Sequence, residues 1–143
     1  MRNCYRGIAC CLLTMMIGTT FLAWGQTPYQ PKYPGDPARS DSEFIAMAYM
    51  RTLLRAQHAY KAKNGKYANS LNELVHTGTF TRRMVNPQQG DYEVSFHPHK
   101  DGFSLLMTPQ HQDSEHRSFF AKEDGVIHGE ENTTANEDSP KVK

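Results

Sequence analysis

The sequence predicts an α+β fold, in which one long N-terminal helix and one short helix pack on a small antiparallel β-sheet of about four strands. Three observations support this fold class. Apolar residues recur at three- and four-residue steps in the first half of the chain, they alternate at two-residue steps after Tyr92, and glycine-containing turns separate the later segments. A sheet with one apolar face must bury that face against another element, and we expect the amphipathic helix to pack on it.

The strongest local pattern is the helix predicted over residues 41–63. Ser40 and Glu43 fit a capping box at its start, and Asn64-Gly65 supplies a left-handed stop. One apolar stripe is predicted to face the sheet, and its members are Ile45, Tyr49, Leu53, Ala56 and Tyr60.

The opposite face of this helix carries a second, thinner apolar stripe beside basic residues. Two interpretations stay open: loops or the sheet cover the stripe, or a partner protein packs against it. The candidate interaction surface consists of Met47, Met50, Arg51 and Leu54.

One short helix and four strands are predicted after the long helix. The short helix covers residues 70–76, with Glu73 at capping-box distance from Ser70 and Gly78 as its stop. Residues 80–91 are expected to form a connecting loop. The predicted strands are Tyr92–Phe96, Phe103–Met107, Arg117–Ala121 and Val126–His128, with turns at residues 100–102 and 123–125.

Two polar segments flank the predicted domain, which is expected over residues 41–128. Residues 26–40 contain four prolines and no apolar periodicity, so we expect a flexible or polyproline-like linker. Residues 129–143 are polar and lack aromatic side chains, so we expect a disordered tail.

The first 25 residues have the layout of a secretory signal peptide. Arg2 and Arg6 precede an uncharged, mostly apolar stretch, and small residues stand at the cleavage-determining positions Ala23 and Gly25. We therefore expect export to the periplasm or the cell exterior. The alternative is an uncleaved membrane anchor over residues 7–24, because this stretch approaches the roughly 20 apolar residues that a spanning helix needs.

Length, composition and cysteine positions narrow the class of protein further. The 143 residues suit one domain. A composition of 38% hydrophobic and 22% charged residues excludes a bundle of membrane-spanning helices and a fully disordered polyelectrolyte. A formal net charge of +1 does not indicate nucleic-acid binding. All three cysteines (Cys4, Cys10 and Cys11) lie in the predicted signal peptide, so the mature domain is expected to have no disulfides.

Several phrases of this sequence resemble the globular domain of type IV pilin-like proteins, which include the major pseudopilins of type II secretion systems. That family shows a helix ending in an A-x-x-x-Y…G-x-Y…S-L-x-x-L run. Here the corresponding residues are Ala56 and Tyr60, then Asn64-Gly65-Lys66-Tyr67, then Ser70-Leu71-Asn72-Glu73-Leu74. The family's sheet often closes with a phrase similar to residues 117–127. The resemblance covers residues 43–128 and implies a pilin-like fold with a role in interaction or assembly at the cell envelope.

One departure from the family lies at the N-terminus. Pilins and pseudopilins carry a Gly-Phe-Thr-Leu-Ile-Glu type sequence, at which their first helix begins. The stretch Gly7–Cys11 lacks the phenylalanine and the glutamate, and the proline-rich segment separates the apolar run from the domain helix. The sequence therefore has no recognisable prepilin peptidase motif.

The histidines suggest a different function. All seven lie after the predicted signal peptide, and His97 and His99 are two residues apart, so they share one face of a strand. Together with a third histidine, which would be His111, His116 or His128, they would build a zinc or copper site. The candidate set is His97, His99 and His128. The alternative function is therefore a small periplasmic metal-binding module.

No motif for catalysis or cofactor binding accompanies these features. The sequence has no glycine-rich phosphate loop, CxxC pair, HExxH motif or Gly-x-Ser-x-Gly elbow. We expect a non-enzymatic exported domain without a cofactor, which binds a protein partner at the cell envelope or a second copy of itself. We expect no nucleic-acid partner, and membrane contact only through residues 7–24 where these are uncleaved.

Overall fold

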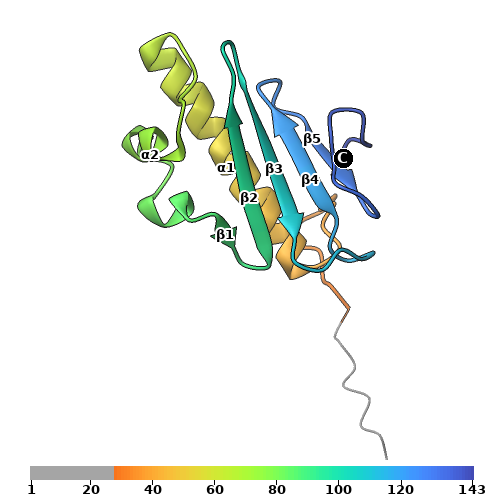
Figure 1. Cartoon of the computed structure of the whole chain (residues 1–143). Helices are drawn as coiled ribbons and strands as arrows, with labels where there is room; N and C mark the ends of the chain where they lie inside the picture. The colour runs from red at the N-terminus through yellow and green to blue at the C-terminus, as the bar shows by residue number, and fades with distance from the viewer. Residues whose placement is uncertain (1–27) are drawn as a thin grey trace, which may run out of the picture.

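The computed structural model describes residues 28–143, which form one long helix packed on a five-stranded antiparallel sheet (Figure 1). The predicted α+β class is confirmed, with five strands in place of four. The predicted signal peptide, or anchor, lies outside the described residues. Across residues 28–143, the helices are all too short or too polar to traverse a lipid bilayer.

The long helix α1 runs from Asp41 to Asn64, and both of its predicted ends are confirmed. Ser40 Oγ accepts a hydrogen bond from the amide of Glu43 at 3.2 Å. At the other end Gly65 has φ 76° and its amide donates to the carbonyl of Lys61 at 2.8 Å. A left-handed glycine thus satisfies one of the carbonyls that the helix end leaves open.

Most residues of both apolar stripes of α1 are buried, because two different parts of the molecule cover the helix. The sheet covers one side (Figure 1), and the segment of residues 65–87 covers the adjacent side, where Tyr49 meets Phe80 edge-on at 6.0 Å between ring centroids. Tyr49 also donates its hydroxyl to the carbonyl of Met84 at 2.9 Å. Ile45, predicted to face the sheet, is instead 54% exposed.

The segment after α1 contains three short helical elements. These are α2 (Leu71–Leu74), η1 (Val75–Thr77) and η2 (Arg82–Val85). The side chain of Gln57 fixes the approach to α2, since its Oε1 accepts from the amide of Ala68 at 2.9 Å and its Nε2 donates to the carbonyl of Ala68 at 3.3 Å. Gln57 and Ala68 are buried, so this pairing satisfies polar groups that water does not reach.

The sheet has the simple order β1-β2-β3-β4-β5, with every neighbour antiparallel. Its strands are β1 (Gln88–Gln89), β2 (Tyr92–Pro98), β3 (Phe103–Pro109), β4 (Ser118–Lys122) and β5 (Ile127–Glu130). The four predicted strands correspond to β2–β5. The first strand, β1, lies in the predicted connecting loop, and its two glutamines offer no apolar alternation to identify it.

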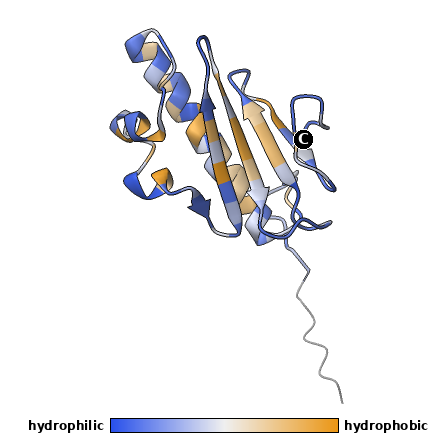
Figure 2. Ribbon diagram, viewed as in Figure 1, coloured by the Kyte–Doolittle hydropathy of each residue, from blue (hydrophilic) through white to orange (hydrophobic). Residues whose placement is uncertain are grey.

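The register places the large apolar side chains of the strands on the face that α1 covers. Figure 2 shows this apolar colouring on the central strands and on the part of α1 behind them. The buried strand residues of this face are Tyr92, Val94, Phe103, Leu105, Met107, Phe119, Ala121 and Ile127. The core therefore lies between one helix and one face of the sheet.

The C-terminal segment, predicted to be disordered, is folded against β5. The amide of Gly129 donates to the carbonyl of Pro140 at 2.9 Å, and the amide of Val142 donates to the carbonyl of Ile127 at 2.9 Å. Ala135 is 3% exposed. The prediction is wrong because main-chain hydrogen bonds, which composition does not reveal, hold this segment in place.

The described part of the predicted linker, residues 28–40, is also held against the domain. Tyr29 donates its hydroxyl to the carboxylate of Asp36, which also accepts from the amides of Lys32 at 3.0 Å and Ala38 at 3.1 Å. Ala38 is buried. From residue 28 onward the segment is therefore a turn built around Asp36 and not an extended linker.

Candidate functional site

The interaction surface predicted on α1 lies inside the core. Met47 and Met50 are fully buried and Leu54 is 6% exposed, so a partner protein does not reach them in this fold. Arg51 is half-buried at the edge of the stripe. The prediction is wrong because the apolar arc of α1 spans about half of the helix circumference and the domain itself covers all of it.

The three histidines predicted as metal ligands do not come together. His97 and His99 are exposed at the end of β2, where the ring of His99 contacts the hydroxyl of Ser104 at 3.2 Å. His128 lies on β5, with β3 and β4 between it and β2, so roughly 14 Å of sheet separates the two strands. Its Nδ1 lies 2.6 Å from the carbonyl oxygen of Ser139.

Among residues 28–143, no three histidine, cysteine, aspartate or glutamate side chains lie close enough together to hold a metal ion. The three-histidine centre is therefore a wrong prediction. It failed because sequence spacing does not tell how many strands separate two segments.

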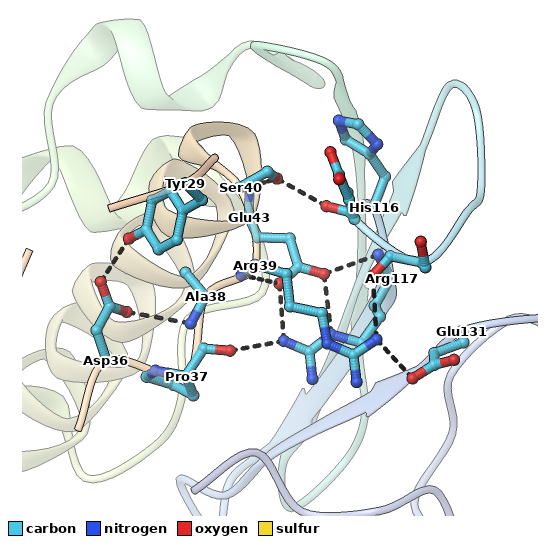
Figure 3. A network of polar contacts seen from close by, with 12 residues as sticks. Tyr29, Asp36, Pro37, Ala38, Arg39, Ser40, Glu43, His116, Arg117 and Glu131 are labelled. Atoms are coloured by element: carbon cyan, nitrogen blue, oxygen red, sulfur yellow. Dashed lines mark hydrogen bonds and ion pairs between the residues drawn. The ribbon is translucent and has the colours of Figure 1, made fainter. Parts of the chain in front are cut away.

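The most densely bonded polar site joins Glu43, in the first turn of α1, to Arg117, which directly precedes β4 (Figure 3). Glu43 Oε1 accepts from Nε of Arg117 at 2.9 Å, and Glu43 Oε2 accepts from Nη2 at 2.7 Å. The carboxylate also accepts from two backbone amides, those of Arg117 and Arg39, both at 2.9 Å. Four hydrogen bonds thus satisfy a carboxylate that is fully buried.

The guanidinium of Arg117 has further partners. Its Nη2 donates to the carbonyl of Pro37 at 2.8 Å, and its carbon lies 5.4 Å from the centroid of the Phe119 ring. Burial disfavours the charge, but the hydrogen bonds and the attraction of Glu43 raise the pKa of Arg117. Arg117 therefore carries its positive charge over the whole pH range in which the domain is folded.

Neighbouring contacts extend this site into a junction between three segments. Arg39 donates to the carbonyl of Ser114 at 3.0 Å and pairs with Glu131 at 2.5 Å, and Ser40 donates to the carbonyl of Glu115 at 2.7 Å (Figure 3). The start of α1, the loop before β4 and the C-terminal segment thus meet here. Because Glu43 and Arg117 use their polar atoms on each other and on the backbone, the site is built for structure.

Sequence reasoning identified one half of this junction. Glu43 was assigned to the capping box, and its carboxylate does reach back, though to the amide of Arg39 and not to that of Ser40. For Arg117, the sequence predicts only that it begins a strand and the phrase similar to the pilin-like family. Glu43 and Arg117 are 74 positions apart, so no local pattern pairs them.

The second feature is the face of the sheet that points away from α1. Leu106 of β3 is the register partner of Phe120 of β4, and both side chains are half-buried. Figure 1 shows no helix over this side of the described chain. A pocket of about 440 Å³ lies beside Phe120, with His99 and Lys122 also in its lining. We call Leu106 and Phe120 the open-face pair.

Comparisons with protein-family models, with curated proteins and with solved structures found no match. The resemblance to pilin-like proteins therefore stays a prediction.

Proposed function

We propose that this chain is an exported, non-enzymatic, pilin-like domain that acts by binding another protein, or a second copy of itself, at the cell envelope. The observation that carries the proposal is the one-sided architecture of the described domain: α1 covers one face of the sheet (Figure 1), and the half-buried Leu106 and Phe120 lie on the other face. The resemblance in sequence favours a role linked to type II secretion or type IV pili.

The open-face pair has the composition that is typical of the centre of a protein interface. Leu106 and Phe120 lie side by side on adjacent strands, and polar side chains surround them, since Ser95 pairs with Leu106 in register and Thr108 lies next along the outward face of β3. A small apolar centre with a polar rim is typical of protein interfaces. Phe120 also meets the ring of His128 edge-on at 6.5 Å, which fixes its position.

The buried charges support binding over catalysis. Glu43 and Arg117 hold each other and the backbone, so neither serves as an acid or a base toward a substrate. The site with the most polar contacts thus stabilises the fold and leaves the open-face pair as the surface with an unassigned role.

Site-specific photo-crosslinking in cells tests the proposal. A photo-reactive amino acid replaces Leu106 or Phe120 in the full chain, and Arg82, exposed on η2, takes the same replacement as a matched control. We expect discrete cross-linked species from the two open-face positions and none from Arg82. Cross-links of equal pattern from all three positions, or none from the open face, would contradict the proposal.

Cell fractionation with intact-mass measurement tests the predicted location. A species beginning at Gln26 in the periplasmic or extracellular fraction supports export with cleavage. An intact N-terminus in the membrane fraction supports the anchor alternative. Recovery of the intact chain from the cytoplasm would contradict both.

A further inference from the structure

A second exposed surface lies on the opposite side of the domain, along the outward face of α1. Tyr33 and Ile45 are the two large apolar side chains that the described residues leave strongly exposed, at 41% and 54%. Ile45 lies in the second turn of α1, and Tyr33 lies in the segment before the helix, with its ring 6.4 Å from that of Phe44, the residue before Ile45. Exposed apolar side chains therefore gather near the start of α1.

Arginines continue this face along the helix. At about 100° per residue, Phe44, Ile45, Arg51 and Arg55 all fall within about 60° of Ala48. Neither arginine forms an ion pair with a residue in the described range; Arg55 donates only to the hydroxyl of Thr52, at 3.2 Å. Apolar groups and cations thus share one surface.

Acidic residues are absent from this stretch of α1, and the two aspartates nearest to its start have partners of their own. The sequence from Phe44 to Asn64 contains no aspartate or glutamate. Asp41 pairs with Lys32 at 2.7 Å, and Asp36 accepts hydrogen bonds from Tyr29 and from two backbone amides. The surface therefore complements a negatively charged partner.

The position of this surface in the chain points to the nature of that partner. The described residues begin at Pro28, and the apolar stretch predicted as signal or anchor ends only four residues earlier, at Trp24. Four extended residues span about 14 Å. A stretch held in a bilayer would thus bring Tyr29, Tyr33 and the start of α1 to the headgroup region, where tyrosine side chains are enriched.

We propose that the outward face of α1, formed by Tyr33, Phe44, Ile45, Arg51 and Arg55, docks on an anionic lipid bilayer. The apolar side chains enter the interface, and the arginines contact the lipid phosphates. This inference rests on the proposed location at the cell envelope but uses a different surface. Since α1 and the open-face pair lie on opposite sides of the sheet, a docked domain presents Leu106 and Phe120 away from the bilayer.

Accessibility of a nitroxide spin label in the reconstituted full chain tests this docking. Cys4, Cys10 and Cys11 are replaced by serine, and the label is attached to Ile45→Cys or, as a matched control on the other side of the domain, to Ser95→Cys. The vesicles contain phosphatidylcholine with about 30% phosphatidylglycerol, or phosphatidylcholine alone. The control separates docking of the face from tethering through residues 7–24, because tethering alone leaves both labels equally accessible.

On the anionic vesicles we expect the label at position 45 to lose access to a water-soluble nickel chelate and to gain access to oxygen, while position 95 is unchanged. Each arginine near an anionic surface contributes about a five-fold preference for the bound state. The double variant Arg51→Gln/Arg55→Gln should therefore reduce the docked-to-undocked ratio about 25-fold, with unchanged far-UV circular dichroism.

Three results would overturn the proposal. Equal chelate access at positions 45 and 95 on both vesicles would show that the face does not contact lipid. Equal protection on vesicles of phosphatidylcholine alone would remove the assigned role of the arginines. Spin–spin broadening at position 45 without protection from the chelate would assign the face to a second copy of the chain. None of these results bears on cross-linking from Leu106 or Phe120, so the two proposals fail separately.

Discussion

Glu43 and Arg117, 74 residues apart in the chain, meet through two side-chain hydrogen bonds of 2.9 and 2.7 Å. The side chain of Glu43 is fully buried and that of Arg117 is 12% exposed. Glu43 stands in the first turn of α1, and Arg117 directly precedes β4. One ion pair therefore couples the capping of the helix to its position on the sheet.

Replacing Arg117 by methionine should destabilise the domain strongly. The substitution leaves a buried carboxylate without its charge partner, which typically costs about 3–5 kcal/mol. The double variant Glu43→Leu/Arg117→Met should recover part of this loss, because it removes both charges. Urea denaturation monitored by circular dichroism gives the free energies of unfolding.

The control for this prediction is Arg39→Gln. Arg39 pairs with Glu131, but the two side chains are 39% and 44% exposed, so water screens the pair and its loss should cost about 0–1 kcal/mol. Equal effects of Arg117→Met and Arg39→Gln would show that the buried pair adds nothing beyond a surface contact.

The double variant Met47→Glu/Leu54→Glu should unfold the domain. Both side chains lie in the core. The free-energy cost of burying two charges without partners exceeds the free energy of unfolding of a small domain, which is about 5–15 kcal/mol. Far-UV circular dichroism should show loss of helix and of cooperative melting. Ile45→Glu, on the exposed face of the same helix, should change stability by about 0.5 kcal/mol or less. A folded double variant would restore the stripe as a surface for a partner.

Local signals made much of the fold predictable from sequence. Ser40 and Gly65 mark the two ends of α1, and the two-residue alternation from Tyr92 marks the central strands. Each of these signals lies within a few residues of the structure that it specifies. The predicted class, the helix and four of the five strands were correct for that reason.

Long-range features were not predictable from sequence alone. The burial of Met47 depends on how the rest of the domain packs around α1, and the Glu43–Arg117 pair joins distant segments. The C-terminal segment looked disordered because it is polar, yet its backbone adds hydrogen bonds to the edge of β5. A composition rule for disorder counts apolar side chains and misses such main-chain pairing.

Removal of residues 132–143 should destabilise the domain by about 2–4 kcal/mol. The truncation removes two backbone hydrogen bonds to β5, each worth about 1 kcal/mol, together with the packing of Val142 against Gly129 and the core. It also exposes the edge of β5, so the truncated chain should associate at high concentration. Urea denaturation measures the first effect and size-exclusion chromatography the second.

Glu137→Gln is the matched control within the C-terminal segment. It removes only the ion pair with Lys122, in which the side chain of Glu137 is 62% exposed, so water screens the pair and the effect should be much smaller than that of the truncation. A truncated chain as stable as the full chain would show that the segment is disordered after all.

Acidification should release the turn around Asp36. Burial opposes ionisation of this carboxyl, but hydrogen bonds from Tyr29 and from the amides of Lys32 and Ala38 lower the pKa of Asp36. Because the pKa is lower in the folded state, the stabilisation is present above the unfolded value of about 3.9 and is lost as the pH falls through the folded value. Amide chemical shifts of Lys32 and Ala38, followed by NMR from pH 6 to pH 2, should therefore move with a midpoint below the usual aspartate range.

The same turn should respond to base through Tyr29. Burial and the hydrogen bond to Asp36 raise the pKa of Tyr29 to about 12, so the stabilisation from its hydroxyl is complete below pH 10 and is lost as the pH rises through about 12.

In the Asp36→Asn variant, the acid transition of the Lys32 and Ala38 amide chemical shifts should vanish, because the amide side chain does not titrate. An acid midpoint at or above the usual aspartate value in the unsubstituted chain would mean that the turn is not held in solution, and residues 28–40 would then be the extended linker that the prolines predict.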